Sequence, residues 1–369
     1  MSYEILVQKW EGIRSEMPQD SWKKLSVLLR TKDEMQVQSS FALLISHGES
    51  ALCAMLYEKE GQLYFQNKPR HPVLWLTCIL EEVRREQSAW HDLYVRGYFH
   101  RLERYWYGNV PWNALSDTQQ KKVVEKSLRS AEIPAGSFMM GPTPGFDTQK
   151  VRHKVTLTKA MRMGIYPCTQ GLYESVMGSN PSFFTGSMRP VEKVSWCDAV
   201  LFCNKLSERE GLVPCYVLPE PFLNDDNWSK KVKWNKSANG YRLPTEAEWE
   251  YCARGGEKHL YSGSDNRDKV AWYDGNSRGK THPVGEKKAN RFGLYDMSGN
   301  VWEWVWDWKG SYSKGLVIDP HGPSSGTTRV SRGGCWRGGT WGTRVSGRYE
   351  YLPSYRNSNL GFRLVRTIK

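Results

Sequence analysis

The sequence predicts an α+β protein in which a small all-α module precedes a larger mixed domain. Over residues 1–130, apolar residues recur at helical spacing behind capping residues. From Ile133 onward Gly, Pro and Trp become frequent, and short strand-like and helix-like stretches replace the long periodic segments. We therefore expect two domains, at residues 1–130 and 131–369, each long enough to bury a core.

Four helical stretches are expected in the first domain. Three cover residues 20–30, 39–59 and 71–98, the second of them split near Gly48. The fourth is amphipathic and runs from Ser116 to about Ala131. Short helices with charge-mixed surfaces indicate a HEAT-like or other small helical module, although no fixed repeat period is visible.

The second domain contains three clear local signals. Residues 153–158 alternate like a strand. Residues 190–206 begin in a strand-like way and continue as an amphipathic helix, with Ser195 as the expected cap. Residues 243–255 form another helix, in which Thr245 and Glu248 make a capping box and the glycine at the end stops the helix.

The composition indicates a globular chain. With 17 Trp, 19 Tyr and 33 Gly, it has many turns and a stacked aromatic core. No apolar run is long enough to predict a transmembrane helix. The start shows no signal-peptide pattern, which favours a cytoplasmic location, with a surface or secreted location as the alternative if a leader was removed.

Eight cysteines are spread along the chain without any CxxC. This pattern predicts reduced, buried thiols and no disulfide framework. Cys197 and Cys203 lie at helical spacing on an apolar run, which favours core packing over metal binding.

The net charge of +13 is concentrated near the C-terminus, where residues 329–369 hold nine Lys and Arg against one acid. A basic end attracts anionic partners, nucleic acid among them. These arginines alternate with Gly and aromatic residues, however, which favours arginines that brace loops through carbonyls and carboxylates. The ones concerned are Arg332, Arg344, Arg348, Arg356 and Arg363. Nucleic-acid binding is therefore not expected.

Five segments in order carry a family resemblance: residues 133–141, 190–206, 241–256, 293–304 and 329–365. Together they resemble the formylglycine-generating, or sulfatase-modifying-factor, domain, whose fold is C-type-lectin-like. The resemblance spans about 235 residues and reaches the C-terminus. It implies an irregular α+β domain held by loops, aromatic residues and, in some members, calcium.

The catalytic members of that family carry a cysteine pair that binds copper and activates oxygen toward a substrate cysteine. Aligned on Arg332-Gly-Gly334, the two positions fall at Gly338 and Thr343. Neither side chain can bind Cu(I), which prefers thiolates, so no copper is expected. The nearby thiol of Cys335 is interpreted as a small buried residue, with a residual reactive thiol as the alternative.

A second enzymatic branch of the superfamily uses an iron held by three histidines, mainly from a helical N-terminal domain. His71, His91 and His100 are too far apart in this sequence for that branch's local motif. Surface histidines are the simpler interpretation.

Residues 296–304 resemble a calcium loop of the family. If the calcium ligands of the family are transferred to this sequence, the backbone carbonyls come from Ser298, Gly299 and Val301, and the carboxylate comes from Glu303. These are the oxygen ligands that calcium prefers. The alternative is a tight Gly-Asn turn whose polar side chains satisfy backbone groups. Both interpretations stay open.

Between the Arg, Gly and Pro residues of the last segment, the tail is rich in Tyr, Trp, Ser, Gly and Arg, which are typical of binding loops. This pattern resembles the variable proteins of diversity-generating retroelements, some of which use this domain to display altered side chains. Ordinary surface drift is the alternative. The candidate ligand-binding residues are Arg337, Gly339, Trp341, Thr343, Gly347, Tyr349, Glu350, Tyr351, Leu352, Ser354, Tyr355, Asn357 and Asn359.

The leading hypothesis is a non-catalytic, monomeric binding protein whose C-terminal loops take a protein or other macromolecular ligand, without membrane association. The rival is an oxygen-dependent metalloenzyme with a displaced metal site. A third hypothesis makes the domain an accessory to a signalling or nucleic-acid-linked system through its basic face.

Overall fold

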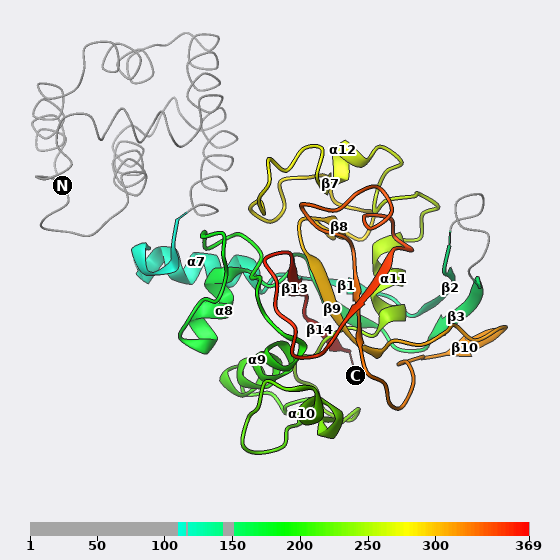
Figure 1. Cartoon of the computed structure of the whole chain (residues 1–369), viewed down its shortest axis with the longest axis horizontal. Helices are drawn as coiled ribbons and strands as arrows, with labels where there is room; N and C mark the ends of the chain where they lie inside the picture. The colour runs from blue at the N-terminus through cyan, green and yellow to red at the C-terminus, as the bar shows by residue number, and fades with distance from the viewer. Residues whose placement is uncertain (1–109, 116, 143–150, 369) are drawn as a thin grey trace, which may run out of the picture. The chain divides into compact units, whose positions relative to one another are not determined.

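The computed structural model describes residues 110–115, 117–142 and 151–368 (Figure 1). They belong to the second of the two units into which the chain divides, Tyr107–Lys369. The helices expected before residue 100 lie outside the described residues, as do His71, His91 and His100.

The helices are η1 (Trp112–Ala114), α7 (Asp117–Ser127), α8 (Gln170–Met177), α9 (Trp196–Arg209), α10 (Asp226–Lys231), α11 (Glu246–Arg254) and α12 (Arg267–Val270). The strands are β1 (Ser130–Ile133), β2 (Gly136–Met140), β3 (His153–Leu157), β4 (Met161–Gly164), β5 (Tyr216–Val217), β6 (Lys233–Trp234), β7 (Ala271–Trp272), β8 (Ser298–Gly299), β9 (Trp302–Trp308), β10 (Leu316–Ile318), β11 (Arg329–Arg332), β12 (Arg348–Tyr351), β13 (Leu360–Phe362) and β14 (Val365–Thr367). Among the described residues no helix is long and apolar enough to cross a bilayer.

Local sequence signals predict the ends of two helices correctly. Ser195 caps α9 and accepts from the Asp198 N–H at 3.0 Å, while the Asp198 carboxylate accepts from the Ser195 N–H at 2.9 Å. Thr245 and Glu248 form the same reciprocal box at the start of α11, which ends at Gly255 in a left-handed conformation. Both caps and the strand at β3 confirm the sequence predictions.

Two boundaries differ from the sequence predictions. The helix expected to reach Ala131 ends at Ser127, because Ser130 and Ala131 pair with Gly164 and Met163 of β4. The strand-like start near Pro190 forms only an isolated bridge, with Thr169. In both cases long-range pairing, which local periodicity does not contain, sets the boundary.

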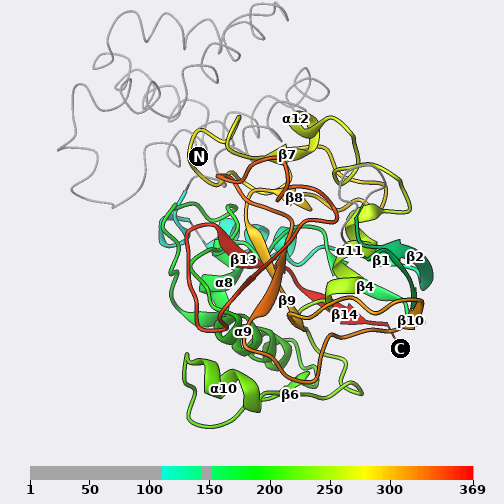
Figure 2. The same cartoon turned by 45° about the vertical axis from the view of Figure 1, so that its right-hand side comes forward.

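A four-stranded sheet in the order β12-β11-β9-β13 forms the centre of the domain. In both views α9 and α11 lie on opposite sides of β9 (Figure 1 and Figure 2). Alternate residues of β9 point to opposite faces. Trp304 therefore joins the apolar cluster of α9, which contains Trp196 and Phe202, and Val305 joins that of α11.

The cysteines within the described residues are free and buried, at positions 168, 197, 203, 215, 252 and 335. Cys197 and Cys203 are fully enclosed in the α9 cluster, which confirms their prediction as core residues. Burial raises the pKa of both thiols, so they remain protonated at neutral pH.

Buried arginines connect these layers. Arg363 follows β13 and donates to Glu303 of β9 at 2.9 and 3.0 Å, and both side chains are fully buried. Its third nitrogen, Nη1, donates to the carbonyls of Gly164 and Ile165 at 2.8 and 3.0 Å, and Nη2 donates also to the Tyr295 carbonyl at 2.7 Å. The end of the chain is thereby fastened to three separate segments.

We expect Arg363→Met to destabilise the domain by about 3–5 kcal/mol, because removing one partner leaves Glu303 buried and uncompensated. The matched control is Arg162→Met, since Arg162 pairs with Glu132 at 2.7 Å on an exposed surface. That change should cost less than about 1 kcal/mol. Urea unfolding measures both, and equal losses would contradict this role for Arg363.

Candidate binding surface

Strand β12 and the loop after it carry a row of aromatic side chains, here called the tyrosine row: Tyr349 and Tyr351 on the strand and Tyr355 on the loop. Tyr349 and Tyr351 are two residues apart on the strand, so they share one face, with ring centroids 4.9 Å apart. Tyr355 stacks on Tyr351 at 4.8 Å, with the rings 7° from parallel. Tyr349 also packs against Trp302, and Tyr351 meets Trp304 edge-on at 6.0 Å. The row is thus a preorganised aromatic surface anchored on β9.

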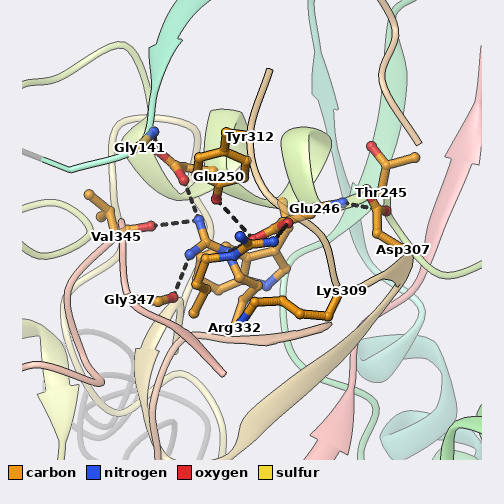
Figure 3. A network of polar contacts seen from close by, with 12 residues as sticks. Gly141, Thr245, Glu246, Glu250, Asp307, Lys309, Tyr312, Arg332, Val345 and Gly347 are labelled. Carbon is orange, nitrogen blue, oxygen red and sulfur yellow. Dashed lines mark hydrogen bonds and ion pairs between the residues drawn. The ribbon is translucent and has the colours of Figure 1, made fainter. Parts of the chain in front are cut away.

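The opposite side of the same strand is held by ion pairs. Arg348 donates to both Glu246 oxygens at 2.6 and 2.8 Å. Arg332 of β11 donates to the carbonyls of Gly347 and Val345 and pairs with Glu250 of α11 (Figure 3). The backbone leading into β12 is therefore held by buried ion pairs, while Tyr349 and Tyr355 of the tyrosine row are exposed.

The bracing role predicted for the tail arginines is confirmed for four of them. Arg332, Arg348 and Arg363 act as described, and Arg356 donates to both Asp198 oxygens at 2.7 and 2.8 Å. Asp198 is also the third residue of α9 and part of its capping box, so Arg356 links the tail to the start of that helix.

The loop after β11 reaches the tyrosine row through polar side chains. Arg337 donates to the Asn357 amide oxygen at 3.1 Å, and Asn357 donates to the Tyr355 hydroxyl at 2.6 Å. From the other side, Ser277 donates to the Trp336 carbonyl at 2.7 Å and Arg267 to the Thr340 hydroxyl at 3.1 Å. The loop is thus supported on both sides.

The structure separates the candidate residues into three groups by exposure. Exposed are Arg337, Gly339, Trp341, Tyr349, Leu352 and Tyr355; half-buried are Glu350, Tyr351, Ser354 and Asn357; buried are Thr343, Gly347 and Asn359. Tyr349 and Leu352 are the most exposed large apolar side chains among these candidates, at 46% and 49%. The buried three shape the backbone and offer no contact area to a ligand.

Gly338 and Thr343, predicted from the sequence to align with the family's catalytic cysteines, hold no thiol. A Cβ added at Gly338 would lie 3.5 Å from the Cys335 sulfur. Thr343 is fully buried, and its hydroxyl donates to the Thr340 carbonyl at 3.2 Å. Cys335 is buried, and burial raises its thiol pKa, as expected for a packing residue. The described residues contain no group of three or more His, Cys, Asp or Glu that could hold a metal.

The calcium-like loop takes the form of a tight turn in which Gly299 and Asn300 both have positive φ, at 83° and 64°. Asn300 accepts from the His282 N–H and donates to its carbonyl, each at 3.0 Å. Glu303 does not fit the calcium role, because Arg363 and the Trp249 indole already hold its carboxylate. Calcium at the carbonyls of Ser298, Gly299 and Val301 stays a prediction.

The sequence reasoning missed an aromatic extension of this surface. Phe183 is 68% exposed, and it meets Phe184 edge-on at 5.0 Å. Phe184 in turn meets Trp336 at 5.3 Å, next to Arg337. The signal in the sequence was the adjacent Phe pair within a Pro, Ser and Gly context, residues 181–186.

Glu192 holds the backbone of Phe183 and Phe184 in place. Its Oε1 accepts from the N–H groups of Phe183 and Phe184 at 2.6 and 2.8 Å. The side chain is buried, and Oε2 has no partner among the described residues. Burial raises the pKa of this carboxyl to about 7, against the lowering effect of the two backbone donors.

Comparison with known proteins identifies the family of this domain. Residues 115–368 match the model of the sulfatase-modifying factor enzyme 1-like domain. The chain belongs to this family. It is 40% identical over 231 residues to the chaperone protein LppX of Paenibacillus barcinonensis, covering 56% of this chain and 79% of that protein. It is 33% identical over 279 residues to the formylglycine-generating enzyme of Mus musculus, covering 63% and 73%.

Solved structures show the same fold. Treponema denticola variable protein 1 superposes with a TM-score of 0.61 at 37% identity, over 65% of this chain and 95% of that one. CarF superposes with a TM-score of 0.53 at 27% identity, over 66% of this chain and 99% of that one. The sequence-based prediction of a C-type-lectin-like domain of this family is confirmed.

The raised pKa of Glu192 predicts a pH-dependent stability. A glutamate in the unfolded chain has a pKa near 4.3, so the folded state binds this proton more tightly. The stability contributed by Glu192 is complete below about pH 4 and is lost as pH rises through about 7. Between pH 5 and 8 we expect the wild type to lose about 1–3 kcal/mol relative to Glu192→Gln, measured by urea unfolding. A difference that is constant with pH would contradict this assignment.

Proposed function

We propose that the chain is a non-catalytic ligand-binding protein, and that the tyrosine row with Arg337, Trp341 and Leu352 forms its ligand surface. One observation carries this proposal. The backbone of the tail is held by buried arginines, while its outward side chains are large, aromatic and exposed. Tyrosine and tryptophan supply contact area at low entropic cost, as binding loops require.

The comparisons support this proposal. Relatives are named for a chaperone and for an enzyme, so the family fold by itself does not determine activity. One of the similar solved structures is named a variable protein. That name suits a scaffold whose surface residues differ between copies. We propose that residues 337–359 are diversified in this way, as in the variable proteins of diversity-generating retroelements.

A protein is the ligand class that this surface fits best. Exposed aromatic and aliphatic side chains occur in the same segment as Arg337, and this combination is enriched at the centres of protein interfaces. Four of the nine basic side chains of residues 329–369 are paired with carboxylates, which reduces the charge available to attract nucleic acid. We propose a monomer that binds such a partner.

Removing Tyr349 and Tyr355 together tests this surface. Tyr351 is kept, because it packs on Trp304 and its loss would disturb the core. The wild type first captures its ligand from extracts of the source cells. Affinities of the identified ligand for wild type and Tyr349→Ala/Tyr355→Ala are then measured by surface plasmon resonance. We expect a loss of at least about 30-fold, since buried aromatic anchors contribute 2 kcal/mol or more.

The matched control is Val213→Ala/Val217→Ala, which removes two side chains that are 56% and 60% exposed. The control should bind like the wild type, and both variants should unfold at the wild-type temperature. Unchanged affinity of the tyrosine variant would sink the site assignment.

The second candidate function is an oxygen-dependent metalloenzyme, favoured by the 33% identity to the mouse formylglycine-generating enzyme. The two functions differ in copper binding. We expect the wild type to yield Cu(I) completely to a competing chelator, whereas Gly338→Cys/Thr343→Cys retains about one Cu(I) per chain, because a thiolate pair suits this soft ion. Gly338 lacks positive φ, so a side chain there causes no left-handed strain, and its Cβ, 3.2 Å from the Cys335 carbonyl, requires the loop to shift by a few tenths of an ångström.

The control for this test is Gly338→Ser/Thr343→Ser, which has the same size but no thiolates and should lose copper like the wild type. Stoichiometric copper retained by the wild type would favour the enzyme over the binding protein.

A further inference from the structure

A second concave site lies outside the surface described above. It is a pocket of about 240 Å³ formed by the turn after β3, the strand β6, the start of α11 and the segment after β10. Its walls include Lys159, Trp234, Lys236, Arg242, His321 and Thr367. None of the candidate ligand-binding residues of the tail lines it.

The carboxylates of this pocket are already engaged. Glu248 accepts from Arg242 at both oxygens, each at 2.7 Å, so that ion pair is internally neutral. Asp319 accepts from the backbone N–H of Thr158 at 2.8 Å and also from its hydroxyl. Among the described residues neither Lys159 nor Lys236 has a carboxylate partner. Asp319 keeps its negative charge, because its donors are neutral, but the two lysines outnumber it, so the pocket carries a net positive charge.

The contact between Lys236 and His321 shows where that charge is concentrated. The Lys236 ammonium lies 3.2 Å from His321 Nε2 and 3.5 Å from Nδ1. His321 Nδ1 also lies 3.4 Å from the carbonyl oxygen of Asp319, so Nε2 is the ring nitrogen closer to the ammonium. Two basic side chains that face each other at this distance offer a ready bridge to an anion, which both can contact as donors.

An aromatic wall lies beside these two basic groups. The Lys236 ammonium is 5.6 Å from the centroid of the Trp234 ring, and the His321 ring meets Trp234 edge-on at 6.5 Å. Trp234 is held in place by Trp306 at 5.4 Å and by the Arg242 guanidinium at 4.9 Å. A flat apolar group could pack on this indole while an attached anion reaches Lys236 and His321.

We propose that this pocket binds a small phosphate monoester that carries a flat or apolar group. The phosphate would contact Lys236 and His321, with Lys159 adding to the local positive charge, and the attached group would lie against Trp234. A pocket of about 240 Å³ is small for a binding site, which limits the ligand to roughly one ring plus the phosphate.

Titration at neutral pH with inorganic phosphate and with phenyl phosphate tests the proposal, because the two probes share the anion and differ in the ring. We expect saturable binding of both by calorimetry, with phenyl phosphate at least about fivefold tighter. Shifts of the His321 imidazole resonances should saturate at the same concentrations. Lys236→Gln and His321→Gln should each weaken both probes at least about tenfold, since each removes one charge-assisted contact.

The matched control is Lys121→Gln, which removes one positive charge from the exposed face of α7. It should bind both probes like the wild type. Non-saturating binding, equal weakening by Lys121→Gln, or His321 resonances that do not move would overturn the site. Equal affinity for the two probes would overturn the role of Trp234. None of these outcomes bears on the tyrosine row, because these side chains are not part of it.

Discussion

The buried guanidinium of Arg332 is the contact on which the display of the C-terminal tail depends. It pairs with Glu250 of α11 and also donates to the carbonyls of Gly347 and Val345, where the chain turns into β12. A buried charge left without its partners is strongly unfavourable, so these groups tolerate one arrangement only. Arg363 and Arg348 fix Glu303 and Glu246 in the same way. Such pairs add little net stability, and their value here is a defined backbone.

In this arrangement, the side chains that hold the tail backbone differ from the side chains that form its outer surface. The groups that hold β12 lie beneath it, and the tyrosine row lies above it, so outer side chains can change without loss of any buried ion pair. Gly338 and Thr343 take no part in the ion pairs that hold the frame, and a Cβ at Gly338 would lie 3.2 Å from the Cys335 carbonyl oxygen. A fold of this kind supports binding and catalysis with equal ease.

Much of the fold could be predicted because its signals are local or belong to the family. The capping boxes at Ser195 and Thr245 need only residues three positions apart, and both form as expected. Exposure in the tail could not be predicted. Thr343 and Asn359 are polar residues of a Gly-rich, binding-type segment, yet both are buried. Phe183 lies about 150 residues before the tail, and it joins the surface only through Phe184 and Trp336.

The sequence by itself determined the family, the helix caps, the buried thiols and the absence of a cysteine pair at positions 338 and 343, because each is a property of residue type and short spacing. The tertiary structure alone decided which side chains face outward and which partners the charged groups take. Glu303 shows the difference. Its sequence context resembles a calcium loop, but Arg363, 60 residues later, holds its carboxylate. Long-range electrostatic partners follow from how the strands assemble, which spacing along the chain does not encode.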